Sequence, residues 1–301
     1  MSWPKEVTIK EVGPRDGLQN EIKMIKTEDK ISWINELSES GLNYIEITSF
    51  VHPKWIPALG DAVEVAKGIK RNPDVTYAAL VPNLKGLERA LEANVDETSI
   101  FMSASETHNK KNINKKIAET LPILKEVVHG SLASGKTVRA YLSTVFGCSY
   151  EGAVDPDQVV RVSDALLEMG VSELSLGDTI GVANPQQVEQ VLEILLKQFP
   201  KEKLAMHFHN THGTALANVV VSLQMDITTF DSSLGGLGGC PYAPGASGNL
   251  ATDDLVYMLN GMGVDTGVKE DQLQRAAAFI EEKVAKPLQS NHYKACQATR
   301  V

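Results

Sequence analysis

The stretch that decides the fold runs over residues 155–210 and reads DPDQVVRVSDALLEMGVSELSLGDTIGVANPQQVEQVLEILLKQFPKEKLAMHFHN. In 155–170 and 184–200, apolar residues recur at three- and four-residue spacing, which is typical of amphipathic helices. The segments 172–178 and 203–210 are short, apolar runs that are typical of buried strands. Helix and strand therefore alternate along this stretch.

The boundaries of the first helix are also marked in the sequence. Asp155 suits the capping position, Pro156 suits the first helical position, and Gly170 suits the end of the helix. The segment 184–200 begins with Asn-Pro and follows the same pattern.

The same alternation extends over most of the chain and predicts an α/β protein. An eight-strand (β/α)₈ TIM barrel with additional C-terminal helices accounts for it best. An open doubly wound sheet is the alternative, but GPRDGLQN after the first strand does not match the glycine-rich phosphate turn of that fold. The expected strands cover 7–13, 43–50, 75–81, 97–104, 137–147, 172–178, 203–210 and 228–235.

We expect one catalytic domain over residues 1–301. The barrel should span about 5–262, and a helical segment should follow over about 263–301. The helices beyond about residue 251 could close the bottom of the barrel or build a subunit contact.

Composition limits the functions to consider. The 301 residues carry a net charge of −9 without a basic patch, which argues against nucleic acid. No apolar run approaches the length of about 18 residues that a membrane span needs, and the N-terminus has neither a secretory signal nor a transit pattern. The three cysteines, Cys148, Cys240 and Cys296, form no CxxC pair. We therefore expect a reduced, cytoplasmic protein.

Reactive residues gather where the predicted strands end, which is where a (β/α)₈ barrel carries its active site. In HFH, His207 and His209 are two residues apart, so on a strand they face the same way. Two imidazoles on one face can bind a metal ion, although the same pair could simply be hydrogen-bonded within the barrel. Asp16 could add a carboxylate, and Asn249 could add a carbonyl oxygen.

Further candidates occupy the same end of the barrel. Arg15 accompanies Asp16 after the first strand, Glu46 and Ser49 lie late in the second strand, and Asp178 closes the sixth. Cys240 lies in LGGLGGCPYAPGASGN, residues 234–249, where the glycines suit a moving lid or a close approach to a ligand. Each feature alone has an ordinary structural explanation, but their joint occurrence favours an active site.

Several motifs resemble the 3-hydroxy-3-methylglutaryl-CoA lyases, a family of metal-dependent TIM-barrel enzymes related to aldolases and Claisen-condensing enzymes. The resemblance covers about residues 5–270, and the cysteine-containing glycine loop is its most specific part. The motifs are EVGPRDGLQNE (11–21), FVHPKWIPALGDA (50–62), PNLKGLERA (82–90), KKNIN (110–114), SLGDTIGVA (175–183), HFHNTHGTALAN (207–218) and GGLGGCPYAPGASGNLATDDL (235–255).

The resemblance implies an enzyme that cleaves (S)-3-hydroxy-3-methylglutaryl-CoA into acetyl-CoA and acetoacetate. It also implies that the enzyme is a homodimer. It implies a Mg²⁺ or Mn²⁺ site made by Asp16, His207, His209 and Asn249. Arg15 would stabilise developing negative charge, Cys240 would be a catalytic acid/base, and either Asp16 or His207 would deprotonate the C3 hydroxyl. The substrate contacts expected on this basis are Arg15, Gln19, Glu46, Ser49, Tyr141, Asp178 and Thr179.

The small-molecule acyl-CoA partner carries phosphates, so the acidic chain needs a local positive surface. THNKKNINKK, residues 107–116, supplies Lys110, Lys111, Lys115 and Lys116 after the fourth strand. These lysines either meet the CoA phosphates or form a solvated helix start.

Other activities remain open on the sequence. The scaffold also suits another metal-dependent aldolase or an enzyme that condenses acetyl-CoA with a 2-oxo acid, although neither needs the Cys240 loop. A non-catalytic barrel that binds metal or acyl-CoA is the third alternative.

Overall fold

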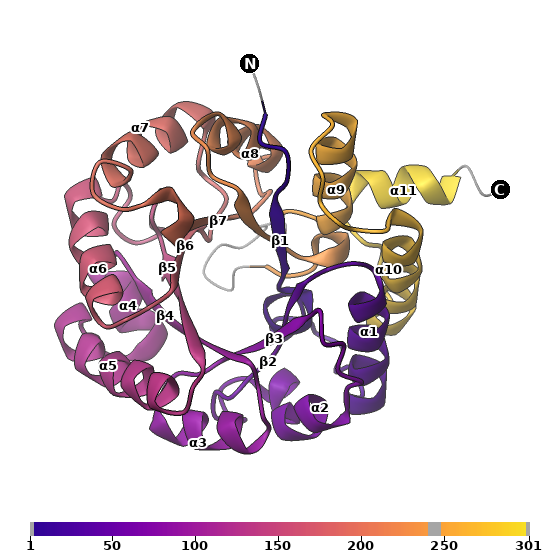
Figure 1. The fold of residues 1–301 in the computed structure, drawn as a ribbon, viewed down its shortest axis with the longest axis horizontal. Coiled ribbons are helices and arrows are strands. Elements are labelled where there is room, and N and C mark those ends of the chain that lie inside the picture. Colours follow the sequence, from indigo (N-terminus) through magenta and orange to yellow (C-terminus); the bar gives the residue numbers. More distant parts are fainter. Residues whose placement is uncertain (1–2, 240–247, 299–301) are drawn as a thin grey trace.

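The barrel predicted from the sequence is confirmed. The computed structural model describes residues 3–239 and 248–298. Within them, eight parallel strands pair in sequence order, and β8 pairs with β1 to close the barrel (Figure 1). The strands are β1 Thr8–Glu11, β2 Tyr44–Ser49, β3 Thr76–Leu80, β4 Glu97–Ser103, β5 Thr137–Ser143, β6 Glu173–Asp178, β7 Leu204–Phe208 and β8 Thr229–Ser232.

Helices surround the barrel as an outer ring (Figure 1). None of the helices in the described ranges is long and apolar enough to cross a membrane. The α-helices are α1 Thr27–Glu39, α2 Ala62–Gly68, α3 Leu84–Glu92, α4 Glu106–Ile113, α5 Ile117–Ala133, α6 Pro156–Glu168, α7 Pro185–Leu195, α8 Ala215–Gln224, α9 Thr252–Gly261, α10 Glu270–Val284 and α11 Asn291–Ala298.

The helix boundaries follow the predicted caps at their starts. The Asp155 side chain accepts a hydrogen bond from the Asp157 backbone N–H at the start of α6. The Asn184 side chain accepts one from Gln187 at the start of α7. However, α7 ends at Leu195 rather than at residue 200. Pro200 disfavours helical backbone in the residue before it, and the chain must turn there to enter β7.

The barrel interior is unusually polar, whereas the outer face of the strands is apolar. In β5, Val138, Ala140 and Leu142 are fully buried and alternate with Arg139. Arg139 crosses the interior to Asp231 on β8, and its Nε lies 2.5 Å from Glu173 Oε1 on β6. The strands therefore pack against the helices through apolar side chains, while ion pairs fill part of the barrel.

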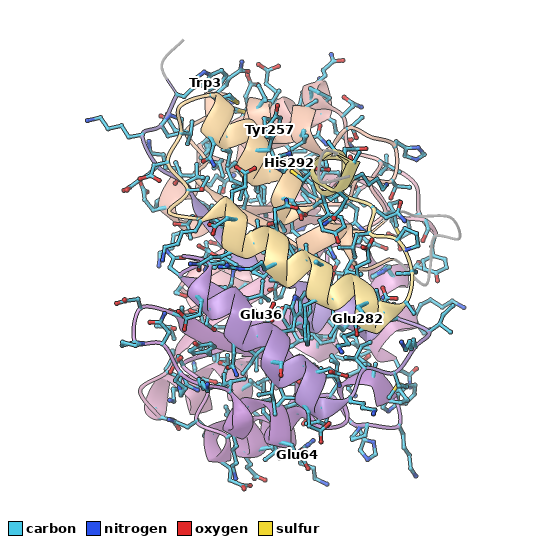
Figure 2. The ribbon with its side chains drawn as sticks, turned by 90° about the vertical axis from the view of Figure 1, so that its right-hand side faces the viewer. Trp3, Glu36, Glu64, Tyr257, Glu282 and His292 are labelled. Atoms are coloured by element: carbon cyan, nitrogen blue, oxygen red, sulfur yellow. The ribbon has the colours of Figure 1, made fainter. Side chains whose placement is uncertain are left out.

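The C-terminal helices lie along the side of the barrel, which corrects the expectation that they could close its bottom. α10 lies beside α1 in both views (Figures 1 and 2), and Lys283 on α10 is 3.5 Å from Asp29 on α1. α10 buries one apolar face, which includes Leu273 and Ile280, so it needs a neighbour along its whole length. The wall beside α1 provides that neighbour.

Candidate active site

A π-helical turn, Gly13–Gly17, follows β1 directly and carries Arg15 and Asp16. Its first N–H, from Gly13, donates to Glu11 Oε1 at 2.8 Å. A Cβ atom on Gly13 would lie 2.5 Å from that same oxygen, so a side chain there would displace Glu11. Glycine therefore lets the chain turn tightly over Glu11 and place the two charged residues at the barrel mouth.

The two histidines of the HFH motif lie on one face at the end of β7, as predicted. Their ring centroids are 5.3 Å apart. His209 lies one residue beyond the regular strand and pairs with Asn249 in an isolated antiparallel bridge. This bridge brings a residue from after the glycine loop to the end of β7.

Asp16, His207 and His209 form a compact cluster of potential metal ligands. One ligand atom from each residue lies within 4.8 Å of the others. Asn249 joins them, because its Nδ2 donates to Asp16 Oδ2 at 2.8 Å. Asn249 Oδ1 and His209 Nδ1 are buried without a hydrogen-bond partner among the described residues. Two unsatisfied buried acceptors beside a carboxylate are what a cation would satisfy.

The protonation states also suit a cation. Burial and the neighbouring His207 lower the pKa of His209 to about 3, so its imidazole is neutral at pH 7 and can act as a ligand. Burial acts to raise the pKa of Asp16, but Arg15, His207 and His209 hold it below its usual value. Carboxylate and amide oxygens with neutral imidazoles match the preferences of divalent Mg²⁺ and Mn²⁺. The residues present therefore fit such an ion.

A second layer fixes His207 in its orientation. His207 Nδ1 lies 3.1 Å from Asp231 Oδ2, which leaves Nε2 available as a ligand. Asp231 also accepts from Arg139 Nη2 at 2.5 Å and from Ser175 Oγ at 2.6 Å. Burial opposes ionisation of Asp231, yet Arg139 and His207 keep its pKa well below the usual range. Asp231 is therefore an anion that accepts a hydrogen bond from His207 Nδ1–H.

Arg15 supplies a buried positive charge beside the cluster. Its Nε is 2.5 Å from Glu46 Oε2, and its Nη1 is 2.5 Å from Asp16 Oδ1. Its guanidinium lies over the Tyr141 ring, 4.9 Å from the centroid, and the Tyr141 hydroxyl donates to Glu46 at 2.9 Å. Burial acts to lower the pKa of Arg15, but the negative charges of Glu46 and Asp16 outweigh it and raise that pKa above its usual value.

The structure places the other predicted substrate contacts in two groups. Gln19 donates to Asp16 Oδ1 at 2.8 Å, so it joins Glu46 and Tyr141 around the cluster. Asp178 instead accepts from the N–H groups of Val182 and Ala183, both at 3.0 Å, and burial raises its pKa to about 6. Asp178 therefore holds the turn after β6.

Two further predicted contacts are small hydroxyl residues. Ser49 Oγ accepts from the Val51 N–H at 3.2 Å. Thr179 Oγ1 is buried and has no hydrogen-bond partner in the described part of the chain. Substrate contact through any of these side chains stays a prediction.

The catalytic role predicted for Cys240 concerns a residue that lies outside the described residues. The chain on either side of residues 240–247 does reach the cluster. Gly239 accepts from Asn20 Nδ2 at 2.9 Å through its carbonyl oxygen. Gly238 has a φ of 124°, and a Cβ atom there would lie 2.6 Å from Asn249 Nδ2. Glycine is therefore required where the loop passes Asn249.

Sequence reasoning missed Asp231, Arg139 and Ser175. All three are fully buried or nearly so, and all three lie within predicted strands. A charged residue in the middle of an apolar strand was the available signal, because such a residue is rarely buried without a partner. The sequence gives no indication that these particular residues would pair.

Comparisons with known proteins find similar sequences and structures over nearly the whole chain. The family model described as HMGL-like matches residues 6–280. A hydroxymethylglutaryl-CoA lyase of Bacillus subtilis is 66% identical over 292 residues, which cover 97% of this chain and 98% of that protein. A crystal structure of the Bacillus subtilis HMG-CoA lyase superimposes with a TM-score of 0.97 at 65% identity, covering 99% of this chain and 100% of that one.

A third relative was solved with ligands. It is an HMG-CoA lyase from Acinetobacter baumannii in complex with coenzyme A and 3-methylmalate. It is 40% identical, with a TM-score of 0.93, and the match covers 98% of this chain and 96% of that one.

Proposed function

We infer the activity of this chain from its family, because the chain belongs to the HMGL-like family over nearly its whole length. It is a carbon–carbon lyase that cleaves 3-hydroxy-3-methylglutaryl-CoA into acetyl-CoA and acetoacetate. The structural observation that carries this conclusion is the convergence of Asp16, His207 and His209 beside the buried Arg15.

We propose that Asp16, His207, His209 and Asn249 hold the divalent ion, which is Mg²⁺ or Mn²⁺. The buried, unsatisfied Asn249 Oδ1 and His209 Nδ1 support this ligand set. A bound ion would supply Lewis-acid assistance to the substrate oxygens, which lowers the cost of deprotonating the C3 hydroxyl. Asp231 would keep the His207 ring turned toward that ion.

Arg15 would stabilise the negative charge that forms when the carbon–carbon bond breaks. Cleavage of the bond between C2 and C3 leaves an acetyl-CoA enolate, whose oxygen needs fixed positive charge. Arg15 is held in place by Glu46 and Asp16 and cannot lose its proton. A charge that is oriented before the reaction costs no reorganisation at the transition state.

Two proton transfers complete the reaction. Of the two candidate bases, we favour Asp16 for taking the proton from the C3 hydroxyl. In the proposed ligand set, His207 keeps its Nδ1–H on Asp231 and gives Nε2 to the ion, which leaves its ring no free lone pair. Cys240 returns a proton to the enolate carbon, and this role rests on the family resemblance and on the approach of the flanking glycines to Asn249. Protonation of that carbon prevents the enolate from attacking acetoacetate again.

Acyl-CoA binding would use the lysines after β4. Lys110, Lys111, Lys115 and Lys116 are all exposed, on α4 or just beyond it, at the carboxyl end of the strand. Replacing both Lys110 and Lys111 by Ala should raise KM for the thioester with little change in kcat. The double variant of Lys197 and Lys201, which are exposed before β7 at the opposite end, is the control. An unchanged KM in K110A/K111A would contradict the proposal.

We also propose a homodimer that works in the cytoplasm. The dimer rests on the family resemblance, and sedimentation equilibrium tests it directly. The cytoplasmic assignment is supported by Cys148, a buried thiol outside any disulfide, which is the state that a reducing compartment maintains.

The activity is tested with the purified chain, the thioester and Mg²⁺ or Mn²⁺, and with acetoacetate as the measured product. Chelation should abolish turnover, and His209→Ala should weaken the affinity for Mn²⁺. His212→Ala is the matched control, because His212 is exposed three residues further along the same segment. No acetoacetate from the metal-loaded protein would contradict the lyase activity. Release of free CoA from acetyl-CoA and a 2-oxo acid would favour the condensing activity instead.

A further inference from the structure

A second group of potential metal ligands lies outside the barrel, where α11 meets α9 and the start of α10. It consists of Glu270 on α10 and of His292 and Cys296 on α11. One ligand atom from each of these residues lies within 4.8 Å of the others. Figure 2 shows His292 beside Tyr257 of α9, on the side of the molecule that carries the C-terminal helices.

The three side chains converge on one point. His292 Nε2 lies 2.5 Å from Glu270 Oε1 and 3.5 Å from Cys296 Sγ. Cys296 Sγ is 4.0 Å from the other ring nitrogen, Nδ1, so the carboxylate and the sulfur are both closest to Nε2. In a proton relay they would approach opposite nitrogens. Convergence on one nitrogen is instead the arrangement of ligands around a shared cation.

The sulfur–nitrogen distance matches that of a tetrahedral zinc site, whereas the oxygen–nitrogen distance is shorter. Zinc bond lengths imply ligand separations of about 3.5 Å between sulfur and nitrogen and about 3.4 Å between nitrogen and oxygen. The Sγ–Nε2 distance of 3.5 Å already agrees. The Oε1–Nε2 distance of 2.5 Å is that of a hydrogen bond and would lengthen by about 0.9 Å as the ion replaces the shared proton. Rotation of the partly exposed Glu270 side chain provides that change.

His292 is held in place before any ion arrives. It precedes Cys296 by four residues, so both side chains project from one face of α11. The His292 ring stacks on Tyr257 with 4.4 Å between centroids, and its backbone N–H donates to Asp254 Oδ1 at 2.7 Å. With Asp254 and Glu270 close by, the surroundings carry the negative charge that a divalent cation requires.

We propose that Glu270, His292 and Cys296 bind Zn²⁺, with water as the fourth ligand. The thiolate makes this site softer than the Asp16 cluster, whose described ligands are oxygen and nitrogen only, so the two sites should prefer different metals. Cys296 releases its proton to solvent when the ion binds. The bound ion fastens the last helix of the chain to the start of α10.

Co²⁺ serves as the probe, because its bond to a thiolate gives an intense charge-transfer absorption. The full-length chain is first saturated with Mg²⁺ and then titrated with Co²⁺. We expect the charge-transfer band in the wild type, its loss in Cys296→Ser, and its displacement by one equivalent of Zn²⁺. Cys148→Ser and Cys240→Ser are the matched controls and should keep the band.

The outcomes separate this site from the active site. Cys296→Ser should keep the wild-type rate of acetoacetate release with Mg²⁺, because Cys296 belongs to no part of the catalytic cluster. A band that is absent from the wild type, that persists in Cys296→Ser, or that disappears in Cys240→Ser would overturn the proposal. A titration of Glu270→Gln gives a second reading, in which the affinity for Co²⁺ should fall at least tenfold while the fold is kept.

Discussion

Asp231 fixes the orientation of His207 in the cluster of potential metal ligands. Its carboxylate accepts from Arg139, Ser175 and His207, and its side chain is completely buried. A ligand histidine commonly donates its second ring N–H to such a carboxylate, which fixes the tautomer and raises the basicity of the ligating nitrogen. Asp231 is therefore a positioning residue that acts through His207.

Asp231→Asn should weaken Mn²⁺ binding by about 10- to 100-fold, because the neutral amide neither orients His207 as firmly nor raises its basicity. Calorimetric titration of Mn²⁺ measures the effect, and circular dichroism checks that the variant is folded. Ser175→Ala removes a hydrogen bond from the same carboxylate oxygen but leaves the charge, so it should bind Mn²⁺ nearly as the wild type does. Equal affinities in Asp231→Asn and the wild type would show that His207 needs no such partner.

The role of Cys240 can be tested separately from metal binding. Cys240→Ser should keep Mn²⁺ and substrate binding while slowing turnover by about 10²- to 10⁴-fold, the usual contribution of a general acid or base. Cys148→Ser is the control, because Cys148 is buried after β5 and its thiol donates to Ser105 Oγ at 3.1 Å. A nearly normal kcat in Cys240→Ser would show that another group protonates the enolate.

At the scale of elements, Glu11 joins the turn that carries Arg15 to the segment after β8. Its Oε1 accepts from the Gly13 N–H at 2.8 Å and from the Leu234 N–H at 2.9 Å. Its Oε2 accepts from the Thr252 hydroxyl at 2.6 Å, at the start of α9. One buried carboxylate thus holds together three segments that are distant in the sequence. Burial raises its pKa to about 7.

This raised pKa predicts how stability changes with pH. Between the ordinary pKa of 4.5 and about 7, the folded state keeps a proton on Glu11 that the unfolded state releases. Stability should therefore fall as pH rises through this window, by up to about 1.4 kcal/mol per pH unit. Glu11→Gln lacks this contribution. As the pH rises from 4.5 to about 7, the free energy of unfolding of the wild type should therefore decline relative to that of the variant.

Urea unfolding of both proteins at several pH values between 4.5 and 7 measures this difference. The buried carboxyl of Asp178, whose pKa is raised to about 6, is present in both proteins and its contribution cancels. A difference between wild type and Glu11→Gln that stays constant with pH would contradict the prediction.

At the scale of the whole molecule, the C-terminal segment supports the catalytic face. After α10, the chain returns to the residues that follow β8, where the Gln289 and Ser290 N–H groups donate to the Gly235 carbonyl at 2.8 and 3.1 Å. A Cβ atom on Gly235 would lie 2.6 Å from Leu288, which itself is 1% exposed. The helices outside the barrel therefore help to fix the segment that leads into residues 240–247.

Leu288→Ala should lower the free energy of unfolding by about 2–5 kcal/mol, because it leaves a cavity beneath Gly235. Leu132→Ala is the matched control on α5, where Leu132 is 41% exposed, and it should change stability by less than about 0.5 kcal/mol. Denaturant unfolding of the three proteins measures both effects. Equal stability of Leu288→Ala and the wild type would mean that the segment after α10 does not pack firmly on the barrel.

The sequence by itself determined the alternation of strands and helices, which favours a closed barrel over an open sheet, and the positions of Arg15, Asp16, His207 and His209 at strand ends. These features depend on periodicity and on neighbours within a few residues, which a single chain displays directly. The common face of His207 and His209 follows from the two-residue repeat of a strand. Asn249 is a candidate ligand from its place at the end of the glycine loop, and the family motifs imply the same role.

Only the tertiary structure decided which distant side chains meet. Arg139 is 92 residues from Asp231, and Glu11 is 223 residues from Leu234. The return of the C-terminal segment to Gly235 likewise depends on the space that the closed barrel leaves. Such pairings are set by strand register across the whole barrel, and local propensity carries no information about register between segments so far apart.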